Sequence, residues 1–152
     1  LVKGQLIGAP VVGVRCTIND GASHPVDSSE MAFRICAVTA IRENYLAAGP
    51  IILEPIMKVE VSAPDEFQGS VTGGLNQRRG VILNSETNDG YVTVQALVPF
   101  SEMFGYSTTL RSATQGKGEF TMEFAKYEPV PKSAQDEMVK KYQEKRREEV
   151  KK

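Results

Sequence analysis

The stretch Pro50-Ile51-Ile52-Leu53-Glu54-Pro55-Ile56-Met57-Lys58-Val59-Glu60-Val61 decides the fold that we predict for this chain. Each of its two prolines biases the preceding residue toward extended backbone, so no helix should run through the segment. From Met57 onward apolar and polar residues alternate, with Met57, Val59 and Val61 on one face. This period of two is typical of a half-buried strand. We therefore interpret the stretch as the end of one domain and the first strand of the next.

Downstream of this strand, the sequence predicts an alternation of helices and strands. Pro64 and the two acids after it suit the first turn of a helix, because proline fits there and acids favour the positive helix terminus. The predicted elements are a helix over residues 64–80, a strand from Val81, a turn at 88–90, a strand over 92–98, a helix over about 101–114 with a bend near Gly105, and a strand over 120–124. The order strand, helix, strand, strand, helix, strand is that of the ferredoxin-like, or split βαβ, fold.

We expect this second domain to be a four-stranded antiparallel sheet with both helices on one face. The other face of the sheet would be open. The side chains expected in its core are Met57, Val59, Val61, Phe67, Leu75, Val94, Leu110 and Phe124, with Phe120 and Met122 lining the last strand toward the same core.

The first 50 residues predict only part of a domain. Residues 11–18 are rich in β-branched side chains and read as a strand, and a turn-rich loop follows over 19–26. Asp27-Ser28-Ser29-Glu30 has the pattern of a capping box, which predicts a helix over about 28–48. Residues 35–41 contain one polar side chain, so this helix should be covered on most sides. One strand cannot provide that cover, and we expect the missing strands to lie upstream.

The fold class that we predict is therefore α+β, with a ferredoxin-like split βαβ domain preceded by part of a second α+β domain of βαβ type. We place the two domains at residues 1–54 and 55–131. A second capping box at Ser133-Ala134-Gln135-Asp136 predicts a final helix within residues 132–152. Nearly every residue beyond Gln143 is charged, so we expect that end to fray in solvent. The chain begins at Leu1 without a methionine, and we interpret it as a piece of a longer protein.

Composition and spacing argue against a catalytic, cofactor or metal site in this chain. With 41% hydrophobic and 24% charged residues and a net charge of -1, it has the composition of a globular protein with no overall attraction to nucleic acid. Cys16 and Cys36 lack the spacing of a metal site. No phosphate-binding loop of the Gly-x-x-x-x-Gly-Lys type is present. His24 is the only histidine and is followed by proline, which makes a Ser–His–acid triad unconvincing.

Two features remain as candidate binding sites. The first is the loop around His24, a titratable ring just before a helix N-terminus; the alternative is an ordinary exposed histidine. The second is a basic set near helix ends and loops of the second domain, formed by Arg78, Arg79, Arg111 and Lys117. The alternative here is that cations simply decorate helix C-termini.

Five segments of the chain resemble the elongation factor G family of translational GTPases. One is Leu75-Asn76-Gln77-Arg78-Arg79-Gly80, and another is Met103-Phe104-Gly105-Tyr106-Ser107-Thr108-Thr109-Leu110-Arg111-Ser112-Ala113-Thr114-Gln115-Gly116. The others are residues 21–33, 52–61 and 121–124. The resemblance runs nearly through the whole chain to about Pro131. It departs from the family pattern at Ser23, where an aromatic residue is frequent, and at Gly74, where an acid is usual.

The resemblance implies that residues 1–54 correspond to the C-terminal half of domain IV, which reaches the decoding centre of the small ribosomal subunit. Residues from 55 onward would correspond to domain V, which lies near the factor-binding RNA of the large subunit. In the domain IV part, the RNA ligands of the tip loop would be Asp20, Gly21, Ser23, His24 and Pro25. In the domain V part, the RNA ligands would be Arg78, Arg79, Arg111, Ser112, Gln115 and Lys117.

By the same resemblance, the parent protein is a GTPase that moves transfer RNA and messenger RNA, with GTP and Mg²⁺ held in a domain upstream of this chain. The implied partner is the ribosome, with no membrane and no DNA, and the chain would be a monomer. A long charged tail resembles mitochondrial members and implies the mitochondrial matrix, with the bacterial cytoplasm as the alternative. A ribosome-recycling or ribosome-protection paralogue and a free-standing ferredoxin-like regulatory module that binds a ligand also remain as alternatives.

Overall fold

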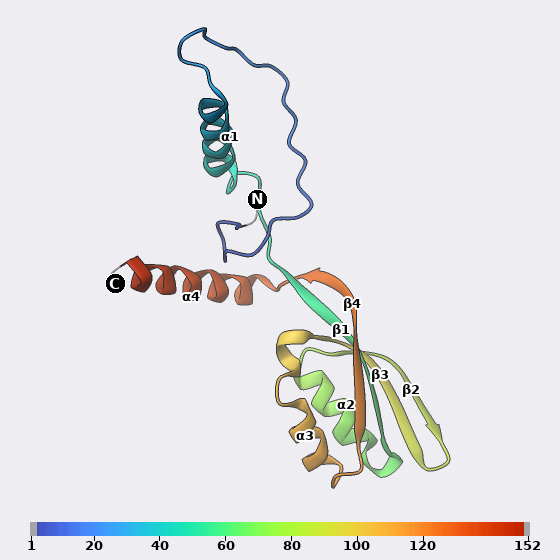
Figure 1. Ribbon diagram of the computed structural model, residues 1–152. Coiled ribbons are helices and arrows are strands. Elements are labelled where there is room, and N and C mark those ends of the chain that lie inside the picture. The colour runs from blue at the N-terminus through green and yellow to red at the C-terminus, as the bar shows by residue number, and fades with distance from the viewer. Residues whose placement is uncertain (1–2, 151–152) are drawn as a thin grey trace. The chain divides into compact units, whose positions relative to one another are not determined.

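The computed structural model describes residues 3–150 of the 152-residue chain, and the chain divides into two compact units. The sheet unit is Leu53–Pro129, and the terminal unit combines Leu1–Ile52 with Val130–Lys152. Figure 1 shows the sheet unit with its two helices on one side of the sheet.

The sheet unit has the ferredoxin-like order that the sequence predicted. Its elements are β1 (Leu53–Pro64), a 3-10 turn (Asp65–Phe67), α2 (Gln68–Gln77), β2 (Val81–Asn88), β3 (Tyr91–Pro99), a second 3-10 turn (Phe100–Met103), α3 (Tyr106–Ala113) and β4 (Glu119–Pro129). The strands form one antiparallel sheet in the order β2-β3-β1-β4. The predicted bend near Gly105 is confirmed, because that glycine has a φ of 72° and separates the second 3-10 turn from α3.

Alternating residues of the two central strands build the core. Val59 lies opposite Ala96 and Val61 lies opposite Val94, so these side chains point to the same face. That face is covered by Leu75 of α2 and by Leu110 of α3, which are fully or almost fully buried. Five of the expected core residues are confirmed as buried: Val59, Val61, Leu75, Val94 and Leu110. Met57 and Phe67 are only half-buried.

The expectation that Phe124 belongs to the core is wrong. Its side chain is 55% exposed, and its ring contacts Tyr127 with 5.1 Å between ring centroids. The reason is one of length: α3 has 8 residues and spans about 12 Å, whereas β4 has 11 residues and spans about 36 Å. The helix cannot cover the whole edge strand. Phe120 packs against the core, with its ring 5.0 Å from Tyr106, whereas Met122 remains 42% exposed.

The terminal unit contains α1 (Glu30–Asn44), and its cap differs from the predicted capping box. Ser29 is the N-cap, and its hydroxyl accepts a hydrogen bond from the Ala32 N–H at 3.1 Å. The helix therefore begins two residues later than predicted and ends four residues earlier. None of its residues is buried, so the expected cover on most sides is absent from the described part of the chain.

The strand expected over residues 11–18 is also absent from the structure. These residues lie in an irregular segment and are almost all exposed. β-Branched residues favour a pleated surface only when a neighbouring strand supplies hydrogen bonds and side-chain contacts. No strand of residues 3–52 pairs with this segment, so its composition is not sufficient to make it a strand.

The last helix, α4 (Lys132–Val150), is longer and more regular than predicted. The Oε1 atom of Gln135 accepts a hydrogen bond from the Ile52 N–H at 3.2 Å, so this side chain docks the helix within the terminal unit. The helix begins at Lys132, so Ser133 lies inside it and is not the N-cap of the predicted capping box. Ion pairs one turn apart, such as Glu137–Lys141 at 2.7 Å, support a charged helix. The exposed residues 144–150 are helical in the structure, fraying of this end stays a prediction, and residues 151–152 lie outside the described residues. Among the helices of residues 3–150, none has the length and apolar composition needed to cross a membrane.

Candidate nucleic-acid interface

The loop over residues 20–25 is exposed throughout, and its backbone is anchored to the start of α1. The His24 N–H donates to the Ser28 hydroxyl at 2.7 Å, and the Ser28 N–H donates to the His24 carbonyl at 3.1 Å. Farther out, the Gly21 N–H donates to the Asp20 carboxylate at 2.7 Å. The loop therefore has its own hydrogen bonds next to the helix cap, although the strand expected on its other side is not formed.

The His24 ring is oriented by its Nδ1 atom. Nδ1 accepts from the backbone N–H groups of Val26 at 3.2 Å and Asp27 at 3.3 Å. An imidazole nitrogen that accepts these bonds carries no proton of its own, so the proton of the neutral ring is on Nε2. The His24 side chain is 64% exposed, and its Nδ1 also lies 3.3 Å from a carboxylate oxygen of Asp27, a contact that is an ion pair only when the ring is protonated on both nitrogens. The neutral ring thus offers one N–H donor, which suits a phosphate or ribose oxygen.

A second exposed surface lies where α3 ends and β4 begins. Buried Thr114 organises this turn: its hydroxyl donates to the Leu110 carbonyl at 2.7 Å and accepts from the Gly118 N–H at 2.8 Å. Gly118 packs so closely that an added Cβ would lie 2.7 Å from that hydroxyl. Gln115 adopts a left-handed conformation with a φ of 53°. The turn is therefore held from within by a side chain that solvent does not reach.

Four residues predicted to bind RNA lie on this turn and on the last turn of α3, and all are exposed. We call them the α3 corner: Arg111, Ser112, Gln115 and Lys117. The ammonium group of Lys117 lies 3.7 Å from the carboxylate of Glu66, which follows the end of β1. Both side chains are more than half exposed, so this pair is weak and leaves the lysine accessible.

Arg78 and Arg79, the other two predicted RNA ligands, lie at the opposite end of the sheet unit and contact the protein itself. Arg78 donates to the carbonyl oxygens of Glu102 and Phe104, the latter at 3.2 Å. Its guanidinium also donates to the Thr109 hydroxyl at 3.0 Å and lies 5.2 Å from the centre of the Tyr106 ring. The structure therefore brings four of the six predicted domain V RNA ligands together in the α3 corner and places Arg78 and Arg79 away from it.

Arg79 forms a bidentate pair with Glu54, with both N–O distances at 2.9 Å, and contacts Glu102 at 3.2 Å. The hydrogen bonds to Glu54 hold the pKa of this guanidinium above its usual value. The Glu54 side chain is 12% exposed, so the pair is partly removed from water. Sequence reasoning missed both acids because they lie 25 and 23 residues from Arg79. It also missed Thr114, whose only signal was a polar residue at a helix end.

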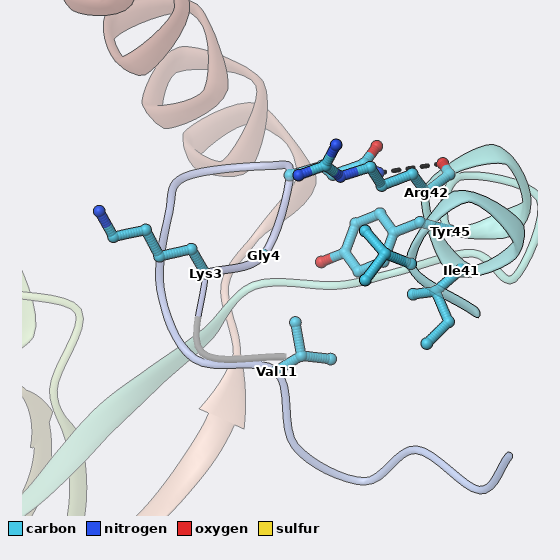
Figure 2. Close-up of a pocket in the computed structure, with 8 residues that line it drawn as sticks. Lys3, Gly4, Val11, Ile41, Arg42 and Tyr45 are labelled. Carbon is cyan, nitrogen blue, oxygen red and sulfur yellow. Dashed lines mark hydrogen bonds between the residues drawn. The ribbon is translucent and has the colours of Figure 1, made fainter. Parts of the chain in front are cut away.

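One cavity of about 210 Å³ lies within the terminal unit (Figure 2). Its lining residues are Lys3, Gly4, Gln5, Val11, Val38, Ile41, Arg42 and Tyr45. The Gln5 side chain closes one side by donating to the Arg42 carbonyl at 3.0 Å. None of the residues predicted to bind RNA lines it. Within residues 3–150, no group of three or more His, Cys, Asp or Glu side chains could hold a metal ion, and Cys16 and Cys36 are free and exposed.

Comparison with known proteins identifies the family. A family model described as "Elongation factor G C-terminus" matches residues 51–138, and one described as "Elongation factor G, domain IV" matches residues 1–49. The chain belongs to the elongation factor G family. The resemblance stated from the sequence is thereby confirmed.

Similar members of the elongation factor G family are about five times longer than this chain. Elongation factor G 1 of Desulfotalea psychrophila is 58% identical over 147 residues, which are 97% of this chain and 21% of that protein. Elongation factor G 1 of Treponema pallidum is 60% identical over the same shares. A crystal structure of a protein from Thermus thermophilus matches with a TM-score of 0.82 and 38% identity, covering 94% of this chain and 22% of that one.

Proposed function

We propose that this chain is the ribosome-binding C-terminal portion of an elongation factor G that promotes GTP-dependent movement of transfer RNA and messenger RNA. Membership of the family supports this role, and two exposed surfaces of the right chemistry support it further. The observation that carries the proposal is the His24 ring, whose Nδ1 is bonded to backbone N–H groups so that the ring presents a donor on an exposed loop.

In this proposal the chain acts by shape and by hydrogen-bond donors, not by chemical catalysis. The tip loop would enter the decoding centre with the His24 ring as a donor to RNA oxygens. The α3 corner would contact ribosomal RNA of the large subunit through Arg111 and Lys117, with Ser112 and Gln115 as neutral polar contacts. A fixed turn lowers the entropy lost on docking, because its residues are already ordered. GTP and Mg²⁺ would be held by residues outside this chain, and the mitochondrial location stays a prediction.

The proposal is tested in a full-length factor in which this chain replaces the matching fifth of Treponema pallidum elongation factor G 1. We expect His24→Ala to slow translocation at least about tenfold, the effect of losing a hydrogen bond to a charged group worth about 1.5–3 kcal/mol. The rate of GTP hydrolysis should stay within about twofold of the wild-type rate. The melting temperature should stay within about 1 °C of the wild-type value, because an exposed loop side chain contributes little to folding. The measurements are single-turnover translocation and GTP hydrolysis on the ribosome.

Arg34→Gln is the matched control, because Arg34 is exposed in the same unit and, among residues 3–150, pairs only with Glu30 on α1. It should translocate normally. Normal translocation by the His24→Ala factor would contradict the proposed role of the tip loop. A chimera that splits ribosomes but cannot translocate would instead favour the recycling paralogue.

A further inference from the structure

We propose that Arg78 and Arg79 are positioning residues, which set the orientation of α3 and so place the α3 corner for RNA binding without touching RNA themselves. This inference rests on the proposed function, because it assumes that the α3 corner meets RNA. It changes the role given to these two arginines by the sequence, which grouped them with Arg111 and Lys117 as ligands.

The Arg78 guanidinium contacts four residues in and just before α3. It donates to the carbonyls of Glu102 and Phe104 and to the hydroxyl of Thr109, and its central carbon lies over the Tyr106 ring. These four residues run from the second 3-10 turn through the first turn of α3. A guanidinium presents its five donors in a fixed fork, so one side chain can fix several acceptors at once. Arg78 therefore joins the end of α2 to the beginning of α3.

Arg79 has an unusual backbone conformation. Its φ of 58° lies in the left-handed region, which is strained for a residue with a Cβ. Such strain persists where the surrounding structure over-determines it, and it is common where geometry serves a function. Here the side chain joins Glu54 at the start of β1 to Glu102 before α3. The two neighbouring arginines thus tie the N-terminal end of α3 to both α2 and the sheet.

The α3 corner lies at the C-terminal end of α3 and in the turn that follows it. The helix is about 12 Å long, and its buried residues are Tyr106 and Leu110. A tilt of about 10° at its beginning would displace its end by about 2 Å, as the length of a 12 Å lever requires. Binding sites need their groups held within about 0.5 Å, so such a tilt would be felt at Arg111 and Lys117. The arginines at one end can therefore control RNA contacts at the other.

The test measures binding of the 152-residue chain, carrying a fluorescent label, to purified bacterial large ribosomal subunits between 50 and 200 mM KCl. An arginine that binds a phosphate can be replaced by lysine, because lysine keeps the positive charge. An arginine whose guanidinium holds four protein groups cannot, because lysine lacks the planar fork of donors. We therefore expect Arg78→Lys and Arg78→Gln to weaken binding equally, by about 3- to 10-fold. Their slopes of log affinity against log salt should equal each other and lie below the wild-type slope, because a displaced α3 corner makes fewer phosphate contacts. Arg111→Gln should lower the slope by about one, as expected for a lost phosphate contact.

Two further variants separate positioning from general destabilisation. Arg111→Gln should matter less in the Arg78→Lys background than in the wild-type chain, because a displaced corner no longer uses that residue fully. Thr109→Val removes one hydrogen-bond partner of Arg78 and should also weaken binding. It replaces Arg78→Lys in the test if that variant proves unstable. Lys126→Gln, an exposed cation on β4 paired with Glu128, controls for loss of surface charge and should bind normally.

Wild-type binding by Arg78→Lys, a lower salt slope for Arg78→Gln than for Arg78→Lys, or additive effects of the Arg78 and Arg111 variants would overturn the positioning role while leaving the proposed function standing. If the wild-type chain shows no salt-dependent binding and Arg111→Gln has no effect, the proposed function of the α3 corner fails and the inference fails with it.

Discussion

Arg79 combines two opposing contributions that a pair of substitutions can separate. Arg79→Gly and Arg79→Ala remove the same ion pairs with Glu54 and Glu102, but only glycine adopts a φ of 58° without strain. We expect the alanine variant to be less stable than the glycine variant by about 1 kcal/mol, measured as the free energy of unfolding in urea. Equal stability of the two variants would show that the backbone carries no strain at this position.

Because of Tyr106, we expect the folding stability of the protein to fall at alkaline pH. Its hydroxyl is buried and has no hydrogen-bond partner among residues 3–150, and burial raises its pKa to about 12, opposed in part by the charge of Arg78. An unfolded tyrosine has a pKa of about 10. The folded group holds its proton more tightly, so its contribution is complete below about pH 10 and is lost as the pH rises toward 12.

Tyr106→Phe tests this point, since phenylalanine keeps the ring and has no proton to lose. At pH 7 we expect the variant to be as stable as the wild type or more stable, because no hydrogen bond is lost. Urea unfolding at pH 9.5 and 11 should show a smaller loss for the variant than for the wild type. An equal loss in both proteins would assign the alkaline sensitivity to other groups.

At the scale of elements, the sequence predicted the helices and strands whose signals lie in their own residues and need no distant partner. The alternation from Met57 to Val61 identified β1, and the glycine at position 105 identified the break before α3. The strand expected over residues 11–18 failed because strand formation depends on a partner that β-propensity does not supply. The prediction for Phe124 failed because alternation gives the face of a strand, but not how far along it a helix extends.

The unequal lengths of α3 and β4 predict unequal costs for two phenylalanines of the same strand. Phe120 contacts the core through Tyr106, whereas Phe124 is mostly exposed. We expect Phe120→Ala to lower the free energy of unfolding by about 3 kcal/mol and Phe124→Ala by about 1 kcal/mol or less. Urea denaturation of the two variants is the measurement, and each serves as the control for the other. Similar costs would mean that the end of β4 is covered in solution.

At the scale of the whole molecule, the candidate site was predictable where its residues are close in sequence. Arg111, Ser112, Gln115 and Lys117 fall within seven positions, so one helix end brings them together. Arg78 and Arg79 share their charge, but the partners that use it come from β1 and from the segment before α3. Charge can be read from a sequence, whereas the direction of a side chain depends on contacts between distant residues. The function of the two arginines could not be separated from that of the α3 corner without the structure.

The two units should also differ in how much of their structure resists opening. All residues of the main core cluster belong to the sheet unit, whereas α1 has no buried residue. Amide groups in a packed sheet exchange only through openings that approach global unfolding, and exposed helices exchange through local fraying. In hydrogen-exchange mass spectrometry of the 152-residue chain, we therefore expect β1 and β3 to be the slowest segments and α1 to be among the fastest. Limited proteolysis should leave a resistant fragment that covers residues 53–129. Protection of α1 equal to that of β1 would show that its apolar side chains are packed in solution, and the division into a packed and an open unit would then be wrong.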